Sequence, residues 1–234
     1  MSRLEALNAF YELLDHLKDR VGGYRNLRDS TAESGWPGQG VYFFFEDGER
    51  REDARALRVV RVGTHGLRRG AKATLWNRLL QHRGMNRGAH AGGGNHRGSI
   101  FRLHVGTALL ARGDYPEEIR ESWGIGSSAD RATRDRELLL ERDVSRHIGN
   151  MPFLWLNVPG DPAPSNDRGL IEAGAISLLS NSARPAIDPP SSSWLGLHAA
   201  RPSIRQSGLW NVNHVDEAWS GSVLPVLEAY VTRM

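Results

Sequence analysis

Two short apolar runs joined by a charged connector place the strongest constraint on the fold of this chain. Residues 41–46 read VYFFFE and residues 58–62 read RVVRV, and both runs are rich in the aromatic and β-branched side chains that favour strands. One glycine precedes the first run and another follows the second. The polar connector is longer than a tight turn, so the pattern predicts two adjacent antiparallel strands with an extended connection.

Hydrophobic periodicity predicts further elements on both sides of these strands. Leucines at helical spacing, with Ser2 and Glu5 as a capping box, predict a helix over residues 2–20. Thr74 is a suitable N-cap for a helix over residues 74–82. Strands are expected at Ser99–Val105 and Phe153–Val158, and helices at Asp130–Ile148, from Asn166 or Asp167 to Leu179, and at Leu224–Arg233. The fold class is α/β (α+β), with a small mixed or antiparallel central sheet flanked by helices.

Three stretches lack such periodicity and are expected to be irregular. Residues 21–39 and 184–207 are rich in small polar residues and contain prolines. Residues 83–98, RGMNRGAHAGGGNHRG, contain six glycines and almost no apolar side chains. The sequence predicts a flexible basic loop there, from which no core can be built.

The composition excludes several classes of protein. The chain has 234 residues, 39% of them hydrophobic and 24% charged, as expected for one elaborated globular domain. It has no cysteine, which rules out disulfides, thiolate metal sites and a cysteine nucleophile. The N-terminal segment carries charges throughout and does not resemble a secretory signal, and no run of about 18 apolar residues could span a membrane. We therefore expect a cytoplasmic protein.

Basic residues are concentrated in one part of the chain. Residues 50–104 contain 13 Arg or Lys and only two acids, so this span carries a net charge of +11 while the whole chain carries +3. Twelve of the 13 are arginines, which suit bidentate phosphate contacts better than lysines do. The segregation favours a polyanion such as nucleic acid as the partner. A solvated basic face that is balanced by acids elsewhere in the fold is the alternative.

Three polar residues of the expected helices are candidates for function. Arg78 and His82 lie four residues apart, on the same face of their helix and at the rim of its apolar stripe. Taken alone, a surface arginine and a satisfied histidine are the simpler explanation. Glu172 lies in a helix that is apolar or small almost all round, so its carboxylate needs a cation, a metal or a hydrogen bond. Its oxygens suit Mg²⁺, whereas a position in the first helical turn would explain it without a ligand.

Taken together and in order, these residues resemble the GIY-YIG nuclease family. Gly40-Val41-Tyr42 stands where that family has its first tripeptide, and Arg61-Val62-Gly63 stands where it has the second. Arg78 and His82 match the Arg and His of the following helix, Glu172 matches the metal-binding Glu, and Asn181 matches the later Asn. The resemblance covers about residues 38–106 and 153–182, and it implies that the two tripeptides lie on adjacent strands and form one wall of the active site.

The resemblance also implies an activity. It implies a phosphodiesterase that cuts DNA with one Mg²⁺ or Mn²⁺ ion per site. By this analogy Glu172 holds the metal, which stabilises the developing charge, and Arg78 clamps a phosphate oxygen. Tyr42, tuned by His82, would orient or deprotonate the attacking water, and Asn181 would bind the phosphate or brace the site.

Two departures from the family pattern concern the site itself. Arg61 replaces the tyrosine of the second tripeptide, so Arg61 or His65 must take over any role of that tyrosine. His65 follows Gly63 by two positions and is a candidate base or phosphate contact, although an ordinary loop histidine explains it as well. About 90 residues separate His82 from Glu172, which indicates an insertion over about residues 83–150.

Basic and polar residues near the expected site are candidates for contacts with the DNA backbone. They are Arg68, Arg69, Lys72, Arg83, Arg87, Asn95, His96 and Arg97. The segment 83–97 would either follow the DNA backbone or remain disordered until DNA binds. A further stretch, SGLWNVNHV (Ser207–Val215), could line a groove, whereas a loop anchored on the core by Trp210 is the simpler explanation.

The sequence thus predicts an N-terminal helix and linker (1–37), a catalytic core (38–182) with its insertion, and a C-terminal extension (183–234) packed on that core. The expected partner is double-stranded DNA, and the expected function is its metal-dependent cleavage. A catalytically inactive DNA-binding module and a protein-interaction domain with a basic patch are the alternatives. Cutting both strands with one site per chain would need a homodimer or two successive visits.

Overall fold

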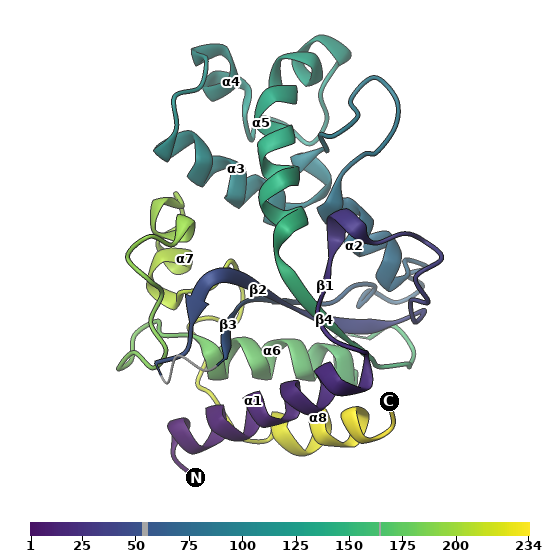
Figure 1. Ribbon diagram of the computed structural model, residues 1–234, viewed down its shortest axis with the longest axis vertical. Coiled ribbons are helices and arrows are strands. Elements are labelled where there is room, and N and C mark those ends of the chain that lie inside the picture. The colour runs from purple at the N-terminus through teal and green to yellow at the C-terminus, as the bar shows by residue number, and fades with distance from the viewer. Residues whose placement is uncertain (53–55, 164) are drawn as a thin grey trace.

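A four-stranded antiparallel sheet forms the centre of the protein (Figure 1). In the computed structural model, β2 (Gly40–Arg50) pairs with β3 (Leu57–Gly63) on one side and with β4 (Pro152–Asn157) on the other. The short β1 (Arg25–Asn26) pairs with β4, which gives the strand order β1-β4-β2-β3. The two strands predicted from the apolar runs are confirmed, and so is their antiparallel pairing.

The structure describes residues 1–52, 56–163 and 165–234. Asp53 and Arg55, which contribute to the basic span of the sequence, lie outside the described residues.

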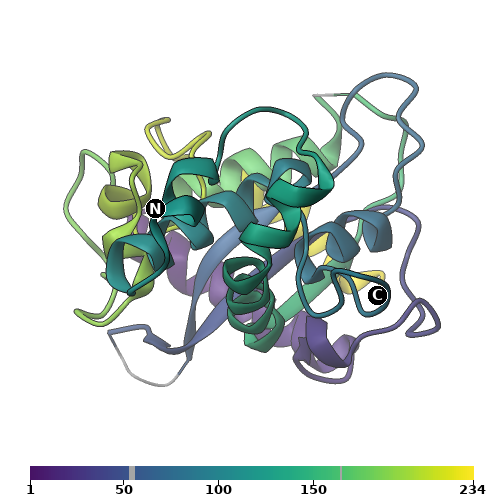
Figure 2. The same cartoon turned by 90° about the horizontal axis from the view of Figure 1, so that it is seen from above.

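Helices cover both faces of the sheet (Figures 1 and 2). One face packs against α1 (Arg3–Arg20), α6 (Asp167–Leu179) and α8 (Val223–Thr232), and the other lies under α2 (Leu75–Arg83), α3 (Ile100–Arg112) and α5 (Arg131–Asn150). Short helical segments complete the description: η1 (Leu27–Asp29), η2 (His96–Gly98), α4 (Glu117–Ser122), η3 (Leu195–His198) and α7 (Pro202–Ser207). None of the helices among the described residues is long and apolar enough to cross a membrane.

Coverage of both faces explains why the first part of β2, residues 41–45, is apolar throughout. Val41, Phe43 and Phe45 belong to the hydrophobic cluster shared with α1, α6 and α8. Tyr42 and Phe44 point to the opposite face and belong to the cluster shared with α2, α3 and α5. Successive side chains of a strand alternate between faces, so a strand buried on both sides has no position left for a solvent-exposed residue. The α/β class and its flanking helices are confirmed.

The helix boundaries follow the capping residues. Ser2 and Glu5 form the predicted capping box at the start of α1. Thr74 caps α2 by accepting from the backbone of Asn77, and Asn166 caps α6 by accepting from Gly169. Each side chain satisfies a backbone N–H that has no partner within the helix, which is why these starts could be located from the sequence.

The predicted strand at Ser99–Val105 is wrong, because this stretch is the start of α3. The side chain of Ser99 caps the helix by accepting from the backbone N–H of Arg102. Phe101, Val105 and Ala108 follow at helical spacing and are fully buried. Apolar and polar residues alternate over these seven positions, but the apolar pattern continues to Arg112, and its length is typical of a helix.

The glycine-rich segment 83–98 is not the unpacked loop that its composition predicts. Met85 and Gly93 are joined by a backbone hydrogen bond of 2.7 Å, and the segment packs on α5. A Cβ at Gly93 would lie 2.7 Å from a side-chain carbon of Leu138, so the backbone passes too close to the helix for any larger residue. The glycines here permit close packing as well as turns.

Gly63, at the end of β3, is required by the tyrosine opposite it. The strand register pairs Tyr42 with Gly63, and the buried phenol ring lies over the glycine. A Cβ at Gly63 would lie 2.7 Å from Cε2 of Tyr42 and still closer to its hydroxyl. The ring is enclosed and cannot move aside, so the position excludes side chains.

We therefore expect Gly63→Ala to lower the free energy of unfolding by roughly 1–3 kcal/mol, the usual cost of overpacking a core. Urea denaturation of the variant and the wild type measures the difference. Gly38→Ala is the matched control, since nothing lies within 4 Å of a Cβ built there. Equal stability of the Gly63 variant and the control would contradict the packing argument.

Candidate active site

A pocket of about 320 Å³ opens where the end of β3 meets α2, α3 and α6. It contains three of the residues that the sequence singles out, Arg61, Arg78 and Glu172. Its other walls are Ile100, His104, Ile176, Arg201 and the segment Trp210–His214. Charged side chains from distant parts of the chain therefore converge on one cavity.

Arg61 is a buried cation at the base of this pocket. Its guanidinium donates to the backbone carbonyl of Trp210 (2.8 Å) and lies over the ring of Phe101, 4.6 Å from the centroid. Burial lowers the pKa of Arg61, and the neighbouring Tyr42 and Glu172 act in the opposite direction. The Nε atom is buried and has no hydrogen-bond partner among the described residues. The side chain is thus held on one side and has unused capacity for an anion.

Glu172 faces the same space from α6. Its Oε1 accepts from the backbone N–H of Thr64 at 3.2 Å, and the hydroxyl of Thr64 donates to the carbonyl of Gly40 (2.8 Å). Burial raises the pKa of the Glu172 carboxyl, while Arg61, His214, the Thr64 amide and Arg78 partly counteract this effect. Within the described residues no side chain makes a salt bridge within 4.0 Å to this carboxylate, so a cation in the pocket would stabilise its charged form.

Arg78 completes the set from α2. It is half-buried, and its guanidinium donates to Gln81 at 2.9 Å, which leaves most of its donors available. Arg78 and Arg61 bring two permanent positive charges to a pocket in which Glu172 supplies the negative charge. This excess of positive charge favours an anionic ligand.

Tyr42 and His82 form a buried chain behind the pocket. The phenol oxygen lies 2.8 Å from Nε2 of His82, and Nδ1 of His82 lies 2.8 Å from the hydroxyl of Ser99. Tyr42 and His82 are both fully buried. Burial, together with the charges of Arg78, Arg61 and Arg102, holds the pKa of His82 well below its usual value. Burial therefore favours the neutral form of His82, and neither Tyr42 nor His82 lines the pocket.

Two further predicted site residues do not line the pocket. His65 is buried, and neither of its ring nitrogens makes a hydrogen bond of normal geometry within the described part of the chain. Burial, followed by the charge of Arg168, lowers its pKa to about 4. The Oδ1 atom of Asn181 accepts from Arg3 and from the backbone of Ile187, both at 3.0 Å. Asn181 thus ties the segment after α6 to α1.

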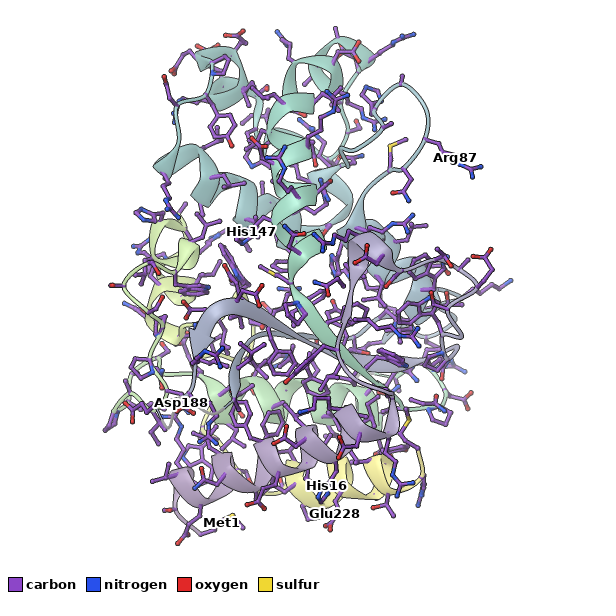
Figure 3. The ribbon with its side chains drawn as sticks, in the orientation of Figure 1. Met1, His16, Arg87, His147, Asp188 and Glu228 are labelled. Carbon is purple, nitrogen blue, oxygen red and sulfur yellow. The ribbon has the colours of Figure 1, made fainter. Side chains whose placement is uncertain are left out.

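The predicted DNA-contacting residues fall into two groups. Arg68, Arg69, Lys72 and Arg87 are exposed, and Figure 3 shows Arg87 at the edge of the molecule. The others make contacts within the protein: Arg83 donates to the carbonyl of Ser30, the side chain of Asn95 accepts from the backbone of Arg97, His96 bonds Glu141, and Arg97 bonds Glu137.

The buried members of this second group do not form a basic surface. The side chains of Arg97 and Glu137 are 3% and 2% exposed and pair at 2.6 Å. His96 is also buried and stacks on Trp123 with 3.8 Å between ring centroids. Arg51, Arg58 and Arg102 of the basic span are likewise buried in ion pairs with acids. Much of the local charge of +11 is therefore neutralised inside the fold.

The C-terminal segment around Trp210 supplies pocket residues that were not among the predicted site residues. The backbone N–H of Trp210 donates to Val60 (2.7 Å), and the Asn211 side chain makes two hydrogen bonds to the backbone of Val62 (3.1 and 2.8 Å). The segment thus adds to the free edge of β3. Both explanations of its sequence hold, because Trp210 is buried in the core and the residues after it line the pocket.

His214 in this segment has an unusual backbone conformation. Its φ is +65°, in the left-handed region that costs a residue other than glycine about 1 kcal/mol or more. The asparagine- and histidine-rich composition of the segment was the signal in the sequence for these residues. Neither periodicity nor charge could place the segment beside Glu172.

The residues present fit a hard divalent cation that is held largely by oxygen. Among the described residues no group of three or more His, Asp or Glu could hold a metal ion by itself. Glu172 is the carboxylate in the pocket. Mg²⁺ is commonly bound through one or two carboxylates together with substrate phosphate and water, so one carboxylate beside an anion-binding pocket is an adequate protein contribution.

Comparison with known proteins yields one finding. No curated protein and no solved structure matches the chain. The family model described as the GIY-YIG domain matches residues 1–234, the whole chain. The chain belongs to the GIY-YIG family.

Proposed function

We propose that this protein is a metal-dependent endonuclease that hydrolyses phosphodiester bonds of double-stranded DNA. Family membership indicates a nuclease in general. The observation that carries the specific proposal is the convergence of Glu172, Arg61 and Arg78 on one pocket, where no cationic side chain among the described residues is bonded to the carboxylate.

The two arginines would bind the phosphate. Arg78 has free donors at the pocket and would clamp a non-bridging oxygen, for which its planar fork is suited. Arg61 lies at the base of the pocket, where its guanidinium would neutralise the negative charge that develops on the phosphoryl group. Because both side chains keep their charge at neutral pH, their contribution does not depend on proton transfer.

Glu172 would hold the ion, Mg²⁺ or Mn²⁺. When bound, the ion supplies stabilisation of the leaving oxygen and of the negative charge on the phosphoryl group. The hydrogen bond from Thr64 fixes one carboxylate oxygen, and the other would bind the ion.

Tyr42 and His82 would act as positioning residues. Their hydrogen-bonded chain to Ser99 is enclosed, so neither reaches substrate in this structure. The chain supports the strand end that carries Arg61 and Gly63. We assign no contact with substrate to His65 or Asn181.

DNA would lie over the exposed basic residues that flank α2. Arg68, Arg69 and Lys72 lie on the connection between β3 and α2, and Arg87 lies in the segment after α2. These side chains are free to contact phosphates, and contacts of this kind position DNA without reading its sequence.

One observation favours a second candidate, an inactive DNA-binding module. Arg61 occupies the position of a tyrosine in the second tripeptide of the family pattern, and this change could have removed activity while keeping affinity for phosphate. DNA binding without cleavage in any divalent metal would support this candidate.

Replacement of Glu172 by Gln tests the nuclease directly. We expect Glu172→Gln to slow metal-dependent nicking of supercoiled plasmid by about 100-fold or more, equivalent to roughly 2.7 kcal/mol of transition-state stabilisation. The amide has nearly the same shape but no charge to hold the ion. Glu228→Gln, on the exposed face of α8 (Figure 3), is the matched control and should cut like the wild type.

The same experiment separates the outcomes. Chelator should abolish cutting by the wild type. Cutting that survives in Glu172→Gln would assign the activity to another site or to a contaminant.

Two arginines of the segment after α2 should behave differently. Arg87→Ala should weaken binding of all DNA sequences alike and reduce the slope of log K against log salt by about 1, because it removes one phosphate contact. Arg97→Ala should leave that slope unchanged and lower the melting temperature, because it leaves Glu137 buried without its partner, a loss of roughly a few kcal/mol.

Fluorescence anisotropy at several salt concentrations and calorimetry measure the two effects. An unchanged salt slope in Arg87→Ala would remove this segment from the DNA interface. Salt-dependent binding to an acidic protein, together with no binding to DNA, would support an interaction domain instead.

A further inference from the structure

One titratable side chain of the pocket has no part in the function proposed above. His214 lines the same cavity as Glu172 and Arg61. Asn211, Val212 and Asn213, the three residues before it, line this cavity as well. His214 belongs to the segment SGLWNVNHV that is prominent in the sequence.

Glu217 orients the imidazole of His214. Nδ1 lies 2.6 Å from Oε1 of Glu217. Because an ionised carboxylate oxygen only accepts hydrogen bonds, the proton of the neutral ring lies on Nδ1 and the lone pair lies on Nε2. Nε2 makes no hydrogen bond within the described ranges of the chain. A carboxylate that holds an imidazole in this tautomer also stabilises the imidazolium that forms when Nε2 takes a proton.

The backbone holds His214 in position from both sides. Before His214 in the chain, the side chain of Asn211 is hydrogen-bonded to the backbone N–H and carbonyl of Val62. After His214, the carbonyl of Val215 accepts a hydrogen bond of 2.7 Å from the hydroxyl of Ser180. Between these anchors His214 has its φ of +65°. A strained conformation persists only where the surroundings fix it, and such residues cluster at active sites.

The other titratable groups around the pocket are less suited to accept a proton. Burial, with the charges of Arg61 and Arg201, lowers the pKa of His104 to about 4, which makes it a weak base. Glu172 is assigned to the ion, and the arginines remain protonated. The hydroxyl of Tyr42 is enclosed and bonded to His82.

We propose that His214 is the general base of the nuclease and that Glu217 is its positioning residue; this inference rests on the function proposed above. Nε2 takes a proton from the attacking water while the water oxygen forms a bond to phosphorus. The P–O ester bond breaks, its electron pair leaves with the sugar oxygen, and that oxygen takes a proton from solvent. The imidazolium then returns its proton to solvent.

The first test is single-turnover cleavage of plasmid DNA at saturating metal. His214→Ala should cut DNA at least about 100-fold more slowly than the wild type, because a general base usually contributes this much. Imidazole added to the buffer should restore part of the rate. Glu217→Gln should lose less, since the ring remains. His16→Ala, on the exposed face of α1 (Figure 3), is the matched control and should cut like the wild type.

The pH dependence separates a base from a structural residue. The wild-type rate should rise tenfold per pH unit in the acidic range and then level off, and this rise should be lost in His214→Ala. The charged and titratable groups around His214 are Glu217, which is bonded to it, and the pocket residues Glu172 from α6, Arg61 from β3, Arg78 from α2, His104 from α3, and Arg201. Saturating metal suppresses the contribution of Glu172 to the profile.

Two measurements do not require activity. Nitrogen-15 NMR of the histidine rings, with His214→Gln for assignment, should show the neutral Nδ1-protonated tautomer for His214. The affinity for Mn²⁺ should be unchanged in His214→Ala. An Nε2-protonated ring, or a large loss of Mn²⁺ affinity that makes His214 a metal ligand, would overturn the proposal.

The outcomes distinguish this inference from the function on which it rests. If the wild type cuts and His214→Ala cuts equally fast with the same pH profile, only the assignment of the base fails. If the wild type cuts no DNA in any divalent metal, the nuclease proposal fails, and the base assignment fails with it.

Discussion

The antiparallel pairing of β2 with β3 is the constraint on which the site depends. Its register puts the ring of Tyr42 over Gly63, and that packing directs the phenol to His82 on α2. The chain leaves the sheet directly after Gly63, so the next residue, Thr64, can bond both Gly40 and Glu172. One strand pair thus connects α2 with α6, the two helices that supply the arginine and the carboxylate.

The insertion between His82 and β4 supports this arrangement. Arg102 of α3 is fully buried, pairs with Glu141 of α5 and donates to the carbonyl of His82 at 2.8 Å. Ser99 at the start of α3 bonds the ring of the same histidine. Gly94 passes so close to the Arg102 guanidinium that no Cβ would fit there. The buried charges cost desolvation, but their several partners in this network offset that cost and fix the C-terminal end of α2.

The sequence was sufficient for those features that depend on local patterns. Capping residues located α1, α2 and α6, and the two short apolar runs located β2 and β3. The start of α3 was missed because seven alternating residues fit the period of a strand as well as that of a helix. Only the length of the apolar pattern distinguishes the two structures. The conformation of segment 83–98 was missed because it depends on contacts with α5, which composition does not reveal.

The sequence likewise predicted those parts of the candidate site that lie on elements with a local pattern. Arg61, Arg78 and Glu172 lie on elements whose order the sequence shows, and the structure brings them together. Arg97 and His96 could not be recognised as buried, because their partners Glu137 and Glu141 lie 40 and 45 residues further along the chain. The placement of Asn211 and His214 depends on hydrogen bonds to β3 and to Ser180, directly after α6, that no local pattern encodes.

The charge of the pocket links these observations to chemistry. An arginine at the position of the second tyrosine adds a buried cation, and burial of that cation becomes favourable when a phosphate enters. The same replacement removes a phenol, and in our proposal His214 supplies the proton acceptor instead. Asn211 docks the segment that carries His214 along β3, and β3 also carries Arg61. A single edge of the sheet thereby holds both the cation proposed to bind phosphate and the segment proposed to supply the base.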